Sequence, residues 1–381
     1  MMILVIACKG NNNGGDDGEE IKRVFYSTSE FVMGADLSYV NQILDYGGVY
    51  KDSGNIEDPY TTFRQYGANV VRLRLFHDPE WIKANYTPPL DHMYNDLRDV
   101  TEAAINSKNK GMAICIDFHY SDTWADPSNQ VPPAAWQGLT LAVLHDSIYN
   151  YTLKTLDRLE AAGVMPEYVQ LGNEINPGFL LPQGDRWNKK SDFIYLMKSA
   201  ISAVRDASAS STIKTKIILH VSKPENTLDW FSGMAASGLT DYDIAGVSYY
   251  YMWSNVVLSS LANQIYQIKS QTGKDVMVME TCYPWTTGYN DSYNNILNTD
   301  KISSFYPATQ KGQYDYLVKM TQEIIDGGGI GVFYWEPAWI TSDMYDGWGK
   351  GSSWECNTLF DFQGNVTKGM DYMTYPYKFD K

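Results

Sequence analysis

Short apolar runs alternate with longer amphipathic stretches along most of the chain. The runs that we predict to be β-strands are residues 31–38, 69–76, 112–119, 167–174, 216–221, 244–250, 276–281 and 329–336. Apolar residues at helical spacing fill the gaps, most clearly over residues 91–110, 141–162, 191–207, 256–272 and 310–327. Near-continuous apolar strands that alternate with helices are typical of parallel strands covered on both faces. Eight such units without a dividing linker predict an α/β fold with a single (β/α)8 TIM barrel.

The first residues of the chain have a different character. Residues 1–8 (MMILVIAC) are apolar, and residues 9–20 (KGNNNGGDDGEE) are polar and rich in acidic residues and glycine. Eight apolar residues are too few to span a membrane, which needs about 20. They resemble the end of a secretory signal peptide, and VIAC resembles a bacterial lipobox that would be lipidated at Cys8. Because no basic region precedes the run, an unrelated apolar leader is the alternative.

These patterns predict three segments. We expect residues 1–8 to be the remnant of a lipoprotein signal peptide, residues 9–25 to be a flexible acidic linker, and residues 26–381 to be the (β/α)8 catalytic domain. The protein would then be secreted or held at a bacterial cell surface, with the outer membrane as one location. Contact with a membrane would occur only through the lipid on Cys8, and a monomer is the expected state.

The charge and the aromatic content of the chain limit the kinds of molecule that it can be expected to bind. The net charge of −15 argues against a nucleic-acid binder, because such proteins draw affinity from basic residues on phosphates. Aromatic residues make up 14% of the chain, with 11 Trp and 29 Tyr. Flat rings with a polar edge suit the C–H faces and hydroxyls of sugars, although a large aromatic core is the alternative. Apart from Cys8, three cysteines remain, Cys115, Cys282 and Cys356, so at most one disulfide can form and buried free thiols are expected.

In a (β/α)8 barrel the chemistry lies at the C-terminal ends of the strands. The predicted strand ends carry Asp36, Arg72, Arg74, Asp117, His119, Asn173, Glu174, His220, Tyr249, Tyr250, Glu280, Trp335 and Glu336. Ordinary strand ends carry turn residues instead. This ring of charged and aromatic residues on one face therefore predicts a functional site, with Glu336 assigned a structural role because it should point away from Trp335.

Two of these residues are carboxylates on opposite strands. Glu174 ends the fourth predicted strand and Glu280 the seventh, so they face each other across the barrel axis. A single strand-end glutamate is ordinarily a salt-bridged structural residue, but glycoside hydrolysis needs a pair, about 5–5.5 Å apart when configuration is retained. The acid needs a pKa raised by burial and by the nearby anion. The nucleophile must stay ionised, which donors such as Tyr249 and Arg72 would favour.

Six motifs resemble those of glycoside hydrolase family 53, the endo-β-1,4-galactanases. They are residues 34–38 (GADLS), 71–74 (VRLR), 117–127 (DFHYSDTWADP), 172–174 (GNE), 280–285 (ETCYPW) and 334–339 (YWEPAW). The similarity extends from about residue 31 to about residue 361. The long motif after the third strand is specific to the family, whereas the Asn-Glu pair is shared by a wider clan of retaining (β/α)8 glycosidases.

The resemblance implies hydrolysis of internal bonds of β-1,4-galactan, the side chain of pectic arabinogalactan, by double displacement with retention. It assigns Glu174 as the acid/base and Glu280 as the nucleophile. Two alternatives stay open. One is another retaining (β/α)8 endo-glycanase, acting on mannan, glucan or xylan. The other is a non-catalytic surface lipoprotein that binds glycans, which would leave the paired glutamates unexplained.

The remaining site residues are assigned by chemistry. Asn173 is placed to bond the sugar 2-hydroxyl, and Arg72 and His119 to orient the sugar or to hold Glu280. Tyr249 is expected to donate to Glu280, and Trp335 to form the floor beneath the reacting sugar. Trp124 and Asp126 either form a neighbouring subsite or hold their own loop in place. Trp285 and Trp339 also follow strand ends, and for each of them contact with the glycan and packing within the protein are the two interpretations. The substrate-binding residues that we predict are Asp36, Arg72, His119, Trp124, Asp126, Asn173, Tyr249, Trp285 and Trp335.

The chemistry requires no cofactor, and no His/Cys cluster has the spacing of a zinc site. Oxygen-rich loops after the seventh and eighth strands carry Asp291, Asp300, Asp343 and Asp346. Such loops can bind calcium, and some members of the family carry a calcium ion there. Structural Ca2+ in these loops and plain solvated acidic loops are therefore the two interpretations.

Overall fold

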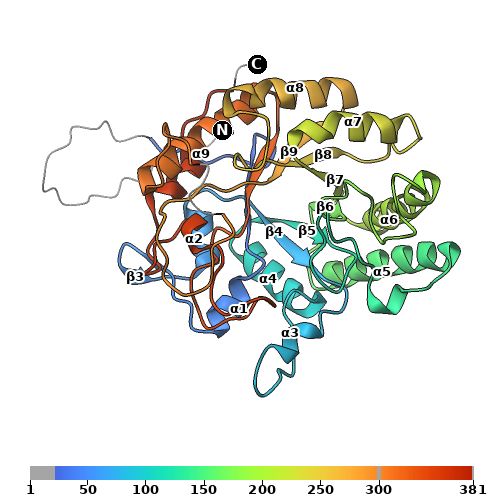
Figure 1. Ribbon diagram of the computed structural model, residues 1–381, viewed down its shortest axis with the longest axis horizontal. Helices are drawn as coiled ribbons and strands as arrows, with labels where there is room; N and C mark the ends of the chain where they lie inside the picture. The colour runs from blue at the N-terminus through green and yellow to red at the C-terminus, as the bar shows by residue number, and fades with distance from the viewer. Residues whose placement is uncertain (1–21, 298–301, 380–381) are drawn as a thin grey trace, which may run out of the picture.

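Eight parallel strands close into a barrel in the computed structural model, which describes residues 22–297 and 302–379 (Figure 1). The strands are, in chain order, β1 Val32–Asp36, β4 Val70–Leu75, β5 Ala113–Phe118, β6 Tyr168–Leu171, β7 Lys216–Ser222, β8 Ile244–Ser248, β9 Asp275–Glu280 and β10 Gly331–Tyr334. Each pairs with its neighbour along the chain, and β10 pairs with β1 to close the ring. The predicted (β/α)8 barrel is confirmed, and each predicted strand overlaps one of these.

Helices surround the barrel (Figure 1). The five long helical stretches expected from the sequence correspond to α4 Leu97–Asn109, α5 Leu141–Ala161, α6 Lys190–Ser210, α8 Leu261–Thr272 and α9 Gln310–Asp326. Four helices were not singled out by the sequence pattern: α1 Val40–Asp45, α2 Pro59–Gln65, α3 Trp81–Ala84 and α7 Pro224–Ala235. A two-stranded hairpin, β2 Lys51–Asp52 with β3 Asn55–Ile56, lies outside the barrel.

Strand alternation divides the barrel interior into an apolar layer and a polar layer. The apolar layer contains Val32, Val70, Cys115, Tyr168, Ile218, Ile244, Met277, Met279 and Phe333. Side chains two residues further along a strand point to the same face. Val70 is therefore followed inside the barrel by Arg72, and Ile218 by His220. The apolar layer closes the barrel below, and the polar layer above it forms the base of the site.

The ends of the described chain lie against each other. Val24 N–H donates to the Thr374 carbonyl at 2.8 Å, and Arg23 pairs with Asp371, so contacts of the barrel domain extend back to residue 23. Residues 1–8 with Cys8, and most of the segment 9–25, lie outside the described residues, so the lipid anchor and the linker stay predictions. Cys115, Cys282 and Cys356 are buried free thiols, as expected. Among the described helices, none is long and apolar enough to cross a membrane.

Candidate active site

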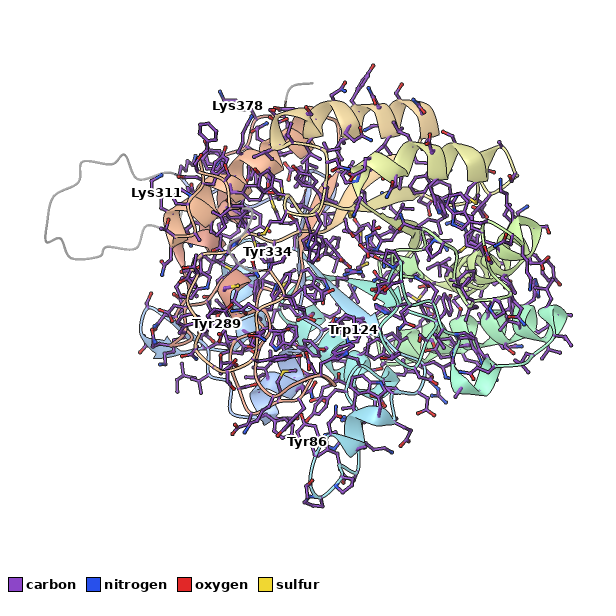
Figure 2. All side chains as sticks on the ribbon, viewed as in Figure 1. Tyr86, Trp124, Tyr289, Lys311, Tyr334 and Lys378 are labelled. Atoms are coloured by element: carbon purple, nitrogen blue, oxygen red, sulfur yellow. The ribbon has the colours of Figure 1, made fainter. Side chains whose placement is uncertain are left out.

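A cavity of about 870 Å³ opens at the C-terminal end of the barrel. Glu174 and Glu280 both line it, together with Asn173, Ser248 and Tyr250. Its aromatic walls come from several loops and consist of Trp124, Trp253, Tyr293, Trp335, Trp339, Trp348 and Trp354. Trp124 lies over the strands near the centre of the view in Figure 2. The two carboxylates therefore share one cavity lined by rings.

Arg72 is the centre of the polar layer beneath this cavity. Its Nη1 donates to Asp36 at 2.8 Å, and its Nη2 lies 2.8 Å from Asp117 and 3.0 Å from Glu280. Nη2 also donates to Asn173 Oδ1 at 3.0 Å. Arg72 is almost completely buried, so one guanidinium faces three carboxylates away from bulk water. This cation fixes the position of Glu280 and stabilises its ionised form.

Glu280 reaches the cavity because β9 is irregular. The pairing of β8 with β9 skips Met279, so that Val247 pairs with Val278 and Ser248 with Glu280. Without this bulge, Glu280 would share the outward face of Val278. Burial raises the pKa of Glu280 to about 6, while the Arg72 guanidinium acts in the opposite direction. Tyr250 donates its hydroxyl to Glu280 Oε2 at 3.0 Å and also favours the carboxylate.

Glu174 leaves its strand through a left-handed turn. Gly172 has φ of +78° and Glu174 itself +46°, which directs the backbone away from β6. A Cβ on Gly172 would lie 2.6 Å from Ile175 Cγ2, so glycine is required there on two counts. Burial and the negative charge of Glu280 raise the pKa of Glu174 to about 8. Of the two glutamates, Glu280 therefore ionises first, and Glu174 is the one that favours the protonated form.

The prediction that Tyr249 donates to Glu280 is wrong, because Tyr250 does so. The Tyr249 hydroxyl donates to the Val256 carbonyl at 3.1 Å and its side chain belongs to the core. Ile244 points into the barrel, so alternation along β8 places the even-numbered positions inside, and Tyr250 continues that series. The alternation was visible in the sequence and would have identified Tyr250.

Trp285 does not line the cavity, which corrects its predicted contact with substrate. Its Nε1 donates to the Glu355 carbonyl at 3.1 Å, and its ring packs against Phe362 with centroids 4.8 Å apart. These contacts hold the half-buried indole against the loops after β10. Trp339, by contrast, does line the cavity.

Asp36 and His119 lie beneath the cavity rather than on its surface. Asp36 is fully buried and accepts from Arg72 and from the Ser38 hydroxyl. His119 Nε2 lies 3.0 Å from Asp117, and its Nδ1 accepts from Ala125 N–H at 2.9 Å. These predicted binding residues therefore support Arg72 and the segment after β5, and their polar atoms are occupied by protein.

Four of the predicted binding residues do line the cavity: Trp124, Asp126, Asn173 and Trp335. The guanidinium of Arg74 lies 3.9 Å from the centroid of Trp124 and supports that ring from the protein side. Asp126 Oδ1 accepts from Ser128 and Asn129 N–H at 2.6 and 3.0 Å, so it also holds its own loop. Sequence reasoning missed the lining residues Ser222, Lys223, Ser248, Trp253, Tyr293, Ile296, Trp348 and Trp354. Tyr250 and Asp346, which also line the cavity, were named without a role in binding the sugar.

The acidic loops after β9 and β10, for which the sequence suggests a calcium ion as one interpretation, are joined by hydrogen bonds. Asp291 accepts from Tyr293 and Ser352 N–H at 2.7 and 2.9 Å. Asp346 Oδ1 accepts from two backbone N–H groups, and Asp343 pairs with Lys350. No group of three or more His, Cys, Asp or Glu side chains among the described residues is arranged to hold a metal, and Asp300 lies outside them. The described carboxylates Asp291, Asp343 and Asp346 are engaged by protein donors, and calcium in these loops stays a prediction.

Replacing Tyr250 with phenylalanine is expected to move the acidic limb of the pH–activity profile to higher pH. The lost O–H donor favours the ionised form of Glu280, so its removal raises the pKa of that carboxyl. Profiles of kcat/KM against pH for Tyr250→Phe measure the shift. Tyr249→Phe is the matched control and should leave the limb in place; equal shifts in both variants would contradict the assignment.

The chain matches the family model "Glycosyl hydrolase family 53" over residues 32–373. It is 39% identical over 338 residues to an arabinogalactan endo-beta-1,4-galactanase of Cellvibrio japonicus, covering 87% of this chain and 86% of that protein. An endo-beta-1,4-galactanase of Bacillus subtilis is 31% identical over 326 residues, covering 84% and 73%.

Solved structures of similar proteins support the same family. The GH53 catalytic domain of Ignisphaera aggregans superposes with a TM-score of 0.83 at 31% identity, covering 94% of this chain and 99% of that one. A fungal beta-1,4-galactanase superposes with a TM-score of 0.76 at 28% identity, covering 90% and 98%. An endo-1,4-beta-xylanase from Caldicellulosiruptor owensensis, at 13% identity and a TM-score of 0.57, shares the fold. The resemblance carried by the sequence motifs is confirmed, and the chain belongs to glycosyl hydrolase family 53.

Proposed function

We propose that this protein is a retaining endo-β-1,4-galactanase that hydrolyses internal bonds of galactan by double displacement. The observation that carries the proposal is the unequal pair of carboxyl groups in one cavity. Glu280 is held as a carboxylate by Arg72 and Tyr250. Glu174 is held as an acid by burial and by the charge of Glu280. Carboxyl groups with separated pKa values supply a nucleophile and a proton donor.

In the first step, Glu280 attacks the anomeric carbon while Glu174 gives its proton to the departing glycosidic oxygen. In the second step, Glu174 takes a proton from water, and that water displaces Glu280 from the sugar. Two inversions at the anomeric carbon leave the configuration unchanged. The active form needs Glu280 ionised and Glu174 protonated, which favours activity between the pKa values of about 6 and about 8.

Asn173 supports the same chemistry from beside the acid. One hydrogen of its Nδ2 is donated to the Ala125 carbonyl at 2.8 Å. The other is available to a sugar hydroxyl in the cavity, and the 2-hydroxyl is the one whose hydrogen bonds strengthen in the transition state. Trp335, which packs edge-on to Trp354 with centroids 4.6 Å apart, offers a rigid ring to the reacting sugar.

Galactan is the proposed substrate because the relatives from Cellvibrio japonicus and Bacillus subtilis are both galactanases. The sugar has an axial O4, so a β-1,4-galactan chain bends differently from mannan, glucan or xylan, whose O4 is equatorial. A cleft shaped for one backbone will therefore discriminate against the others.

Incubating the purified protein with linear β-1,4-galactan, mannan, xylan and β-1,4-glucan tests the proposal. We expect galacto-oligosaccharides from galactan, with rates on the other polymers at least about 100-fold lower, a difference of about 2.7 kcal/mol in transition-state binding. If another polymer were cleaved faster than galactan, that polymer would be the substrate and the proposal would be wrong. Binding of galactan without any product would favour the non-catalytic alternative.

A further inference from the structure

Two buried residues connect the acid Glu174 to the interior of the barrel. Ser248 Oγ lies 2.6 Å from Glu174 Oε1, and His220 Nε2 lies 2.8 Å from Ser248 Oγ. On the other side of the ring, His220 Nδ1 lies 3.0 Å from Asn173 Oδ1. The imidazole of His220 is completely buried and Ser248 is nearly so. The His220 link of the chain Asn173–His220–Ser248–Glu174 is therefore shielded from water, while Asn173, Ser248 and Glu174 line the cavity.

The direction of the first hydrogen bond follows from the amide of Asn173. Its Nδ2 faces the Ala125 carbonyl, which can only accept, and its Oδ1 faces Arg72 and Gln170, whose nitrogens can only donate. Turning the amide over would break all three bonds. Asn173 Oδ1 is therefore an acceptor toward His220, and the hydrogen between them belongs to His220 Nδ1.

The other hydrogen bonds of the chain then follow. A neutral imidazole with its hydrogen on Nδ1 has an acceptor at Nε2. Burial lowers the pKa of His220 well below its usual value, and the nearby charge of Arg72 acts in the same direction, so the ring is neutral. Ser248 must give its single hydroxyl hydrogen to Nε2. The hydrogen between Ser248 and Glu174 then has to come from the Glu174 carboxyl group.

We propose that His220, acting through Ser248, selects the protonated form of Glu174. The two residues are positioning residues, because they act through Glu174 and not on the sugar. This inference rests on the proposed role of Glu174 as the acid. The inference also gives His220 and Ser248 a role in the second step. Once Glu174 has given its proton to the leaving oxygen, its carboxylate has no hydrogen-bond donor in Ser248, and it is therefore a stronger base toward water.

If Glu174 were ionised, the donors and acceptors along the hydrogen bonds from Glu174 to Asn173 would have to be reversed. Ser248 would donate to the carboxylate and His220 would carry its hydrogen on Nε2, losing the bond from Nδ1 to Asn173. The Glu174 N–H lies 3.4 Å from Nδ1 and is a weak replacement. The charged groups that act on Glu174 are Glu280, Asp126 and Arg72, and those acting on His220 are Arg72, Asp117 and His119. The variants below leave all of these in place.

The tautomer of His220 tests the proposal without any substrate. Protein labelled with 15N at histidine, observed by long-range 1H–15N NMR at pH 7, should show His220 with its hydrogen on Nδ1. The signal is assigned by its loss in His220→Asn. His119 is an internal control with the opposite tautomer, because its Nδ1 accepts from Ala125 N–H and its Nε2 faces Asp117. Finding the hydrogen of His220 on Nε2 would overturn the proposal.

Titration of the Glu174 side-chain carboxyl by 13C NMR gives the second test. Ser248→Ala removes the acceptor of the acid proton, and His220→Asn frees the Ser248 hydroxyl to donate to the carboxylate. Both should move the midpoint about one pH unit lower than in the wild type, where burial and the charge of Glu280 raise the pKa of Glu174. Ser248→Thr keeps the hydroxyl and should restore the wild-type value.

A rise of the midpoint in Ser248→Ala would mean that Ser248 donates to an ionised Glu174, and the proposal would fall. An unchanged midpoint in both variants would also reject it. Absence of galactan hydrolysis by the wild type would count against the proposed function alone, since both NMR measurements are made without substrate.

Discussion

Glu280→Ala is expected to lower kcat/KM on β-1,4-galactan by about four orders of magnitude or more, because it removes the nucleophile. No other carboxylate among the residues lining the described cavity is held by Arg72, so none can replace it. The measurement is the rate of reducing-end formation with linear galactan. Azide added to the variant should enter the vacated space and attack from the side of Glu280, giving an α-galactosyl azide from an activated galactoside.

The control for this variant is Glu102→Ala. Glu102 lies on α4, is exposed, and among the described residues forms an ion pair with Arg98 alone, at 3.7 Å. Its removal should leave the rate on galactan unchanged. Activity of Glu280→Ala within tenfold of the wild type would show that the reaction does not pass through this carboxylate.

Arg72→Met is expected to destabilise the fold by about 3–5 kcal/mol, the usual cost of leaving buried charge without its partner. The guanidinium is the shared counter-ion of Asp36, Asp117 and Glu280, and methionine supplies similar volume without charge. The loss is measured as the change in free energy of unfolding in urea at neutral pH.

Arg205→Met is the matched control, since Arg205 also bridges two carboxylates, Asp241 and Asp243, but at the surface. Water screens that pair, so the cost there should be about 1 kcal/mol or less. Equal losses for the two variants would show that Arg72 is no more than an ordinary ion-pair residue.

The sequence predicted the barrel well because both faces of its strands are buried. Apolar runs between amphipathic helices leave few alternatives, and the C-terminal ends of such strands must converge on one mouth. Glu174, Glu280 and Asn173 were found by that argument. The short helices α1 and α3 were missed, because four to six residues carry too little periodicity to stand out from a loop.

The finer geometry of the site depends on features that strand runs alone do not reveal. The bulge at Met279 turns Glu280 inward, and only the pairing of β8 with β9 shows it. Tyr249 and Tyr250 are adjacent tyrosines at the end of β8, and only the alternation from Ile244 distinguishes the one that faces the cavity. Trp253, Trp348 and Trp354 come from loops, whose paths are set by tertiary contacts and not by local pattern.

The stereochemistry of the first product tests the central claim most directly. Cleavage of β-1,4-galactan followed by 1H NMR from the first seconds should show the β-anomer of the new reducing end appearing first, with the α-anomer growing later by mutarotation. That order requires two displacements at one carbon, with Glu280 and Glu174 acting in one cavity. Initial appearance of the α-anomer would mean a single displacement by water and would contradict the roles assigned to both glutamates.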